Sequence, residues 1–129
     1  MKSERINTLL AEMVSSQGFI NIDQHDIDSF KAKVGEIDAE KVSGKTEEIG
    51  VILDSAIFSV IARNDNKQIK GLLFVIRIPQ ENKLASYIND VHDVIDKLGD
   101  ELECKWGVAT MNNLQSDHFE IIMVAGFEN

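Results

Sequence analysis

The chain has 129 residues, of which 43% are hydrophobic, and its 22 acidic and 13 basic side chains give a formal net charge of −9. This length predicts one domain with a sizeable core, and the acidic balance argues against nucleic acid and anionic membranes as partners, because both attract clustered cations. The single cysteine excludes an intrachain disulfide. Without a signal-like N terminus or an apolar run of about 18 residues, we expect a cytoplasmic protein with no membrane insertion.

Two helices are predicted at the N terminus. Apolar residues recur at helical spacing from Ser3 to about Ser16, and Gly18 follows as the residue that ends this helix. The second helix begins after Ile22 and stops at Gly35, with Asp23 placed to cap its first turn.

A third helix follows a polar segment in which residues 37–39 predict a short edge strand. Ser43 or Thr46 is expected to cap this helix. Its apolar residues keep to one face without a gap, at Ile49, Ile52, Leu53, Ala56, Ile57, Val60 and Ile61. Val51 and Phe58 widen the stripe, so this helix is predicted to be the most buried one.

The second half of the chain predicts a mixed sheet. An almost continuous apolar run at 71–78 is typical of a central strand, and a helix at 82–98 leads to an alternating strand at 101–110. This βαβ unit should make a parallel pair. Because residues 111–117 form a short connector to the last strand, the two final strands should form an antiparallel hairpin. The predicted fold class is α+β: two N-terminal helices, then a four-stranded mixed sheet covered by helices.

Most motifs in the chain have ordinary structural explanations. Residues 39–46 fit only the loosest form of a phosphate-binding loop, with one internal glycine and glutamates nearby that would repel an anion. None of the three histidines has a partner at metal-ligand spacing. We therefore expect no metal site and no cofactor held by this chain.

The polar cluster before the second helix is the strongest candidate site. Asp23 as N-cap would place Asp26 at the third helical position, which completes a capping box, while Ile22 and Ile27 occupy the two positions of a hydrophobic staple. Asn21 is left without a role in this arrangement. An amide and two carboxylates at an exposed junction can also orient a water molecule, which is the help that phosphoryl transfer requires.

This cluster resembles a loop of the bacterial tubulin homologue FtsZ, in which an Asn-x-Asp-x-x-Asp element follows Gly-Leu-Ile. Here Asn21, Asp23 and Asp26 have the same spacing, after Gly18-Phe19-Ile20. The likeness continues through Lys70-Gly71, Trp106-Gly107-Val108 and Val124-Ala125-Gly126-Phe127. It implies that residues 1–129 form a single domain like the FtsZ C-terminal domain, with 1–17 resembling the end of the family's central helix.

The resemblance implies a protein-interaction module of a cell-division or cytoskeletal filament system. In that family the loop of one subunit enters the GTP pocket of the next, so Asp23 and Asp26 would orient the attacking water and Asn21 would be a polar contact. The family's Gly-Gly-Gly-Thr-Gly-Thr-Gly run has no counterpart in this sequence. GTP is thus expected only in a partner, either an FtsZ/tubulin-like GTPase subunit or another self-associating copy, and this chain would supply at most the trans-acting half of an enzyme site.

Two alternatives stand beside this expectation. The chain could be a structural remnant of the fold whose aspartates only cap a helix. It could also be a small oligomeric ligand-binding α+β domain, since such folds host unrelated functions.

Overall fold

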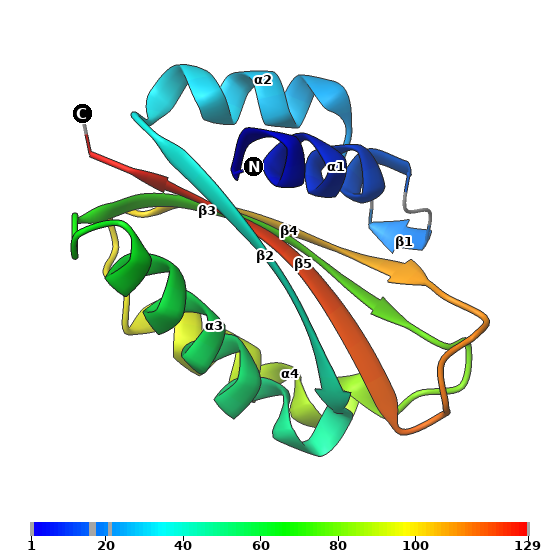
Figure 1. The fold of residues 1–129 in the computed structure, drawn as a ribbon. Coiled ribbons are helices and arrows are strands. Elements are labelled where there is room, and N and C mark those ends of the chain that lie inside the picture. The colour runs from blue at the N-terminus through cyan, green and yellow to red at the C-terminus, as the bar shows by residue number, and fades with distance from the viewer. Residues whose placement is uncertain (1, 16–17, 21, 129) are drawn as a thin grey trace.

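The computed structural model describes residues 2–15, 18–20 and 22–128. Within these residues the helices are α1 (Lys2–Ser15), α2 (Gln24–Lys33), α3 (Ile49–Arg63) and α4 (Leu84–Asp96), with a short 3-10 turn η1 (Thr46–Glu48). The strands are β1 (Gly18–Ile20), β2 (Ile37–Lys45), β3 (Ile69–Ile78), β4 (Glu103–Thr110) and β5 (His118–Phe127). They form one sheet in the order β1-β4-β3-β5-β2. Helices α1 and α2 cover one face and α3 and α4 the other (Figure 1).

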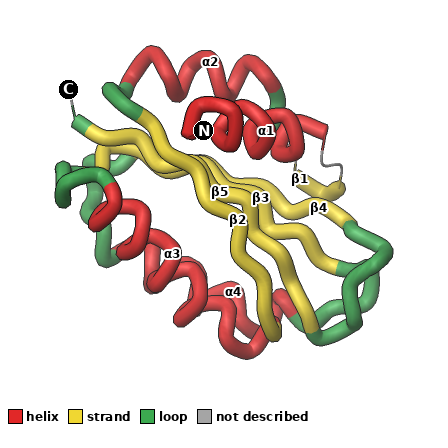
Figure 2. Tube along the Cα trace, in the orientation of Figure 1, coloured by secondary structure: helices red, strands yellow, loops and turns green. Residues whose placement is uncertain are grey.

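Two apolar clusters fill the spaces between these three layers. One joins α3 and α4 to the sheet through side chains such as Leu53, Val91 and Phe74. The other joins α1 and α2 to the opposite face through Met13, Ile27 and their neighbours. Strand β3 is buried along almost its whole length because both faces are covered, which confirms the predicted central strand. The α+β class and the parallel β3–β4 pair are confirmed as well. Figure 2 shows the helices in two layers around the strands.

The predicted C-terminal hairpin is wrong. Strands β4 and β5 run in opposite directions, but β3 lies between them and pairs with both. The connector 111–117 crosses the end of β3, where the Met111 N–H donates to the Ile78 carbonyl at 2.8 Å. Burial explains the order, because β5 is buried along most of its length and suits the interior, whereas most residues of β4 are exposed or half-buried.

The sheet is larger than the four strands predicted from the sequence. The edge strand expected at 37–39 extends through Lys45 and pairs with β5 along nine residues. A fifth strand, β1, arises from a segment predicted as loop and pairs with the end of β4.

Helix α3 departs from its prediction in two ways. Neither Ser43 nor Thr46 caps it, because η1 precedes the helix and Thr46 instead exchanges hydrogen bonds with Asn82. Val51 and Phe58 are 72% and 73% exposed, although they were expected to be buried. The sheet and α4 cover only the opposite side of α3, and its outer face lies at the surface.

A buried carboxylate fastens both helical layers to the edge of the sheet. Asp38 on β2 is completely buried and accepts hydrogen bonds from Arg5 of α1 at 2.7 Å and from Arg63 of α3 at 2.9 Å. Asn64 and the Ala39 N–H donate to the same carboxylate, at 2.9 and 2.8 Å. Burial acts to raise the pKa of Asp38, but the hydrogen bonds from Arg63, Asn64 and the Ala39 N–H outweigh it and lower the pKa from 3.8 to about 2.

Two glycines form the seat on which α2 rests. Gly71 and Gly126 lie directly opposite each other on β3 and β5. A Cβ atom at Gly71 would lie 2.5 Å from the Phe30 ring, and one at Gly126 would lie 2.5 Å from a methyl group of Val34. The bare backbone therefore lets α2 and the residue after it approach the sheet closely, and this approach sets the position of the candidate site at the start of α2. No described helix combines the length and the apolar character needed to cross a membrane.

Candidate functional site

The capping box predicted at the start of α2 is confirmed. The Asp26 N–H donates to Asp23 Oδ1 at 2.9 Å, and the Asp23 N–H donates to Asp26 Oδ2 at 3.0 Å. Ile22 and Ile27, the predicted staple positions, are both buried in the cluster beneath α1 and α2. Asn21, the third residue of the predicted site, lies outside the described residues.

Asp26 also forms an ion pair that the sequence did not reveal. Its Oδ1 lies 2.5 Å from Nζ of Lys105 on β4, and the Asp26 side chain is only 14% exposed. The hydrogen bond from Lys105 is the largest cause of a lowered Asp26 pKa, followed by the bond from the Asp23 main chain. Both Asp26 oxygens are thus engaged within the chain. The 79 residues between the partners explain why no local pattern indicated the pair.

Asp23 has the more accessible carboxylate of the two. The residue is exposed, and one of its oxygens, Oδ1, accepts the capping hydrogen bond. Among the described residues the other oxygen has no hydrogen-bond partner. The site therefore presents one committed carboxylate, on Asp26, and one that can still accept a hydrogen bond from outside the chain.

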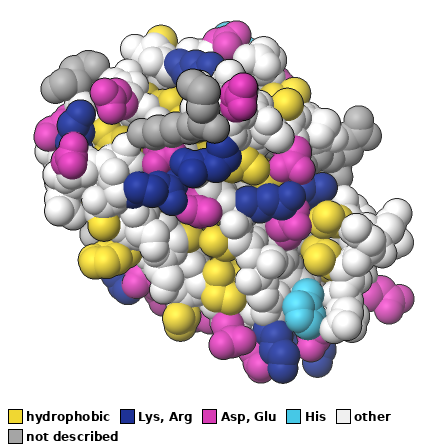
Figure 3. Space-filling view, in the orientation of Figure 1, with side chains coloured by type: hydrophobic (Ala, Val, Ile, Leu, Met, Phe, Trp, Pro, Cys, Tyr) yellow, Lys and Arg dark blue, Asp and Glu magenta, His cyan; other side chains and the backbone are white. Residues whose placement is uncertain are grey.

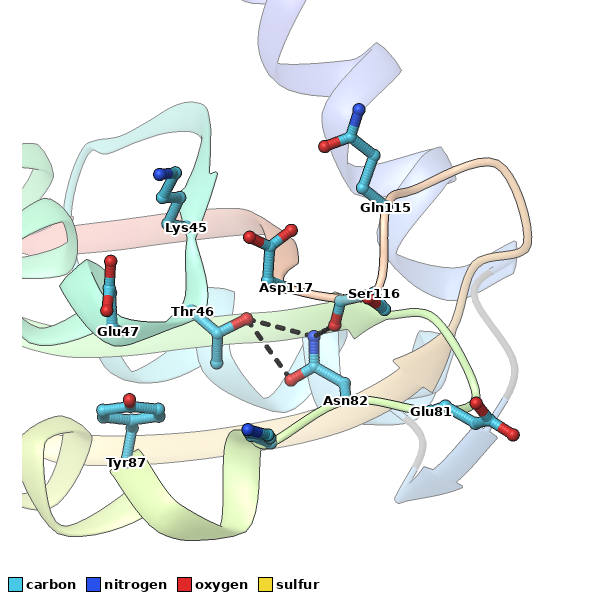
Figure 4. A pocket seen from close by; sticks show the side chains of 10 residues that line it. Lys45, Thr46, Glu47, Glu81, Asn82, Tyr87, Gln115, Ser116 and Asp117 are labelled. Carbon is cyan, nitrogen blue, oxygen red and sulfur yellow. Dashed lines mark hydrogen bonds between the residues drawn. The ribbon is translucent and has the colours of Figure 1, made fainter.

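A separate hollow of about 1010 Å³ lies where β2 and the connector 111–117 meet the start of α4. Figure 4 shows Asn82 in its wall, where its amide donates to Thr46 Oγ1 at 3.0 Å and to the Ser116 carbonyl at 2.8 Å. A third bond joins the same amide to the His118 carbonyl at 3.0 Å. Asn82 thus links the segment before α4 to η1 and to the end of the connector 111–117. The hollow is lined by side chains of both charges, so it favours neither anions nor cations as ligands. The charged residues are Lys45, Lys83, Glu47, Glu81 and Asp117.

Comparisons with known proteins find structures with a similar fold but no match by sequence. No family model and no curated protein matches the chain. A structure of the FtsZ W319Y mutant from M. jannaschii superposes with a TM-score of 0.70 at 19% identity, covering 96% of this chain and 38% of that one. The helical model of the TubZ-Bt four-stranded filament gives 0.66 at 10% identity, covering 98% and 34%. E. coli HypE, a hydrogenase maturation protein, gives 0.52 at 8% identity, covering 99% and 44%.

The chain therefore has a tubulin/FtsZ-like fold, of the type found in the FtsZ C-terminal domain. It spans about a third of the length of the FtsZ and TubZ chains that it matches. The similarity to HypE shows that this arrangement of helices and strands also occurs in a protein whose description is unrelated to filaments.

Replacing Asp23 separates capping from charge at this site. Asp23→Ala removes the acceptor for the Asp26 N–H and should lower the free energy of unfolding by about 1 kcal/mol. Asp23→Asn keeps a capping oxygen and should change it by only a few tenths of a kcal/mol. Urea denaturation followed by circular dichroism measures both. Equal losses for the two variants would contradict a cap that works through its side-chain oxygen alone.

Proposed function

We propose that the chain is a protein-interaction module of a cytoskeletal or cell-division filament system. It meets a GTPase subunit, or another copy of its own kind, through the surface formed by Asp23 and the first turn of α2. The observation that carries the proposal is the fold shared with FtsZ and with the TubZ filament subunit, combined with an exposed carboxylate at the junction whose spacing resembles the FtsZ loop. The printed description of the TubZ structure is that of a four-stranded filament, which supports assembly as the context.

The two carboxylates would act differently on a partner's GTP. Asp23 has an oxygen available to orient a water molecule, and placing the nucleophile is the main work in phosphoryl transfer. Asp26 is held by Lys105 and by the Asp23 main chain, so its role is to fix the turn that aims Asp23. Asn21 would add a polar contact to the partner. GTP stays in the partner subunit throughout.

The proposal is tested by adding the full chain to a polymerising FtsZ-type GTPase and measuring phosphate release and pelleting. We expect the chain to enter the pellet and to raise phosphate release per polymer. Asp23→Asn should remove most of that increase while leaving pelleting intact, because its helix cap is kept. Asp93→Asn, the same change at an exposed aspartate of α4 on the other face of the sheet, is the matched control and should behave as the wild type.

Two outcomes count against the proposal. If the wild type neither pellets nor changes phosphate release, the interaction module is excluded for that partner class. If it pellets but Asp23→Asn and Asp26→Asn release phosphate like the wild type, the catalytic half is wrong. The second outcome favours a structural remnant of the fold, a reading that the full engagement of Asp26 already supports.

A further inference from the structure

Helix α2 is attached to the sheet by apolar contacts at both of its ends. In its second half the Phe30 ring lies over the bare backbone of Gly71. At its start Ile22 and Ile27 are buried in the cluster beneath α1 and α2. Apolar burial is non-directional. These contacts therefore set how deeply the helix lies on the sheet, but they do not fix the lateral position of its first turn.

A small rotation of α2 about this seat would displace the candidate site. Asp23 precedes Phe30 by seven residues, which is about 10 Å along a helix axis. A rotation of about 10° would then move Asp23 by about 2 Å. Since a misplacement of about 1 Å is enough to slow a positioned reaction, the first turn needs a directional contact if Asp23 is to act on a water molecule.

A gap between α2 and the sheet leaves room for such a movement. It has a volume of about 170 Å³ and is lined by Ser29 and Phe30 of the helix and by Leu73 and Cys104 of the strands. Side chains are thus not closely packed between this part of α2 and β4. Two ion pairs lie in the lining of the gap and join the helix to β4, one near each end of α2.

The pair between Asp26 and Lys105 supplies the directional contact. Lys105 Nζ lies 2.5 Å from Asp26 Oδ1, while Asp26 Oδ2 accepts the Asp23 N–H at 3.0 Å. Strand β4 pairs with β3 from Glu103 to Thr110, so the backbone of Lys105 is held within the sheet. The Asp26 carboxylate therefore connects the main chain of Asp23 to a rigid strand.

The second ion pair between α2 and β4 cannot do the same. Figure 3 shows basic and acidic side chains next to one another at the surface of this molecule, and such exposed pairs contribute little. Lys33 and Glu103 form a pair of that kind, at 3.5 Å and with 56% of each side chain exposed. The Asp26 side chain, in contrast, is only 14% exposed and is held from two directions.

We propose that Lys105 is the positioning residue of the candidate site, acting through Asp26 to set the direction in which Asp23 presents its second carboxylate oxygen. This role rests on the function proposed above, because the direction of Asp23 matters only where a water molecule and a partner's nucleotide lie in front of it. Lys105 itself contacts neither of them. It holds the first turn of α2 in the one orientation from which Asp23 can reach the water.

The ion pair is tested first on the free, full chain. In an NMR titration of the aspartate carboxyl groups, Lys105→Met should raise the pKa of Asp26, because the hydrogen bond from Lys105 is the largest cause that lowers it. Lys105 is half exposed, so the fold accepts methionine there. Lys33→Met, the same change at the last residue of α2, is the matched control and should leave the pKa of Asp26 unchanged. An Asp26 pKa that Lys105→Met does not move overturns the proposal without any partner.

The positioning role is tested with the polymerising FtsZ-type GTPase. Lys105→Met should lower the increase in phosphate release by about tenfold, while pelleting stays as in the wild type because the helix cap is kept. Lys105→Arg keeps a charged donor and should keep most of the increase. Lys33→Met should release phosphate like the wild type.

The outcomes separate this role from the proposed function. If the wild type raises phosphate release and Lys105→Met raises it equally, the positioning role is overturned and the proposed function stands. The same holds if Lys105→Arg loses as much as Lys105→Met, because the effect then does not depend on a charged donor. A wild type that neither pellets nor raises phosphate release is the failure of the proposed function, and the role of Lys105 fails with it.

Discussion

Asp38→Asn should lower the free energy of unfolding by about 3 kcal/mol, the largest loss expected from any single polar substitution in this chain. The carboxylate is completely buried and receives donors from α1, α3 and its own strand. An asparagine would keep one oxygen but turn an N–H₂ group toward the guanidinium donors. A loss of this size is a large fraction of the 5–15 kcal/mol that typically separates folded from unfolded protein.

Urea denaturation measures this loss, and Asp54→Asn supplies the control. Asp54 faces Lys97 at 4.0 Å, with more than half of each side chain exposed, and such surface pairs contribute little. The control should therefore change stability by less than about 0.5 kcal/mol. A loss at Asp38 no larger than that at Asp54 would show that the cluster does not fasten the helices to the sheet.

The pH dependence of stability gives a second test of the same carboxylate. The pKa of Asp38 is lowered from 3.8 to about 2 by folding, so its contribution is fully present above pH 3.8 and is lost as the pH falls toward 2. Between those values the wild type should lose about 2 kcal/mol more than Asp38→Asn, which has no such group to titrate. Parallel acid denaturation curves for the two proteins would contradict this assignment.

The features that the sequence predicted correctly are those determined by residues close together along the chain. The capping box at Asp23 and Asp26 needs only residues three apart, and the continuous apolar run at 71–78 needs only cover on both faces. The helix of the βαβ unit, α4, follows in the same way from the spacing of its apolar residues. These features were confirmed because their energetics are contained within one segment.

Long-range pairing was beyond such patterns. Lys105 holds Asp26 across 79 residues, and Asp38 is held by Arg5 and Arg63, which are 33 and 25 residues away. A charged residue between Ile37 and Ala39 looks like surface in the sequence, although here it is the most buried polar group of its strand. The order of β3, β4 and β5 was likewise decided by total burial rather than by connector length.

The exposed α3 residues show the opposite error. Val51 and Phe58 fit an apolar stripe, so periodicity predicted their burial, yet one chain has no surface with which to cover them. Periodicity identifies the apolar side of a helix but not how much of that side the rest of the fold covers, and here the sheet and α4 leave Val51 and Phe58 outside the core.

Gly126→Ala should lower the free energy of unfolding by about 1–3 kcal/mol, because the new Cβ overpacks the seat of α2. That atom would lie 2.5, 2.7 and 2.8 Å from three carbons of Val34, one of which is the Val34 Cβ and cannot rotate away. Gly126 lies in extended backbone within β5, so the backbone itself accepts alanine. At a site where the new methyl group met no neighbour, the same change would stabilise the protein slightly, because alanine lowers the conformational entropy of the unfolded chain.

A double-mutant cycle with Val34→Ala decides whether the clash is the cause. Val34→Ala alone should cost about 2 kcal/mol for the two methyl groups removed from a buried site. Together the two changes should cost less than the sum of the single losses by more than about 0.5 kcal/mol, since the space vacated by valine receives the new methyl group. Simple additivity would mean that α2 does not rest on Gly126. Additivity would also mean that the contact at Gly126 does not set the distance between α2 and the sheet. The pairing of Asp26 with Lys105 depends on that distance.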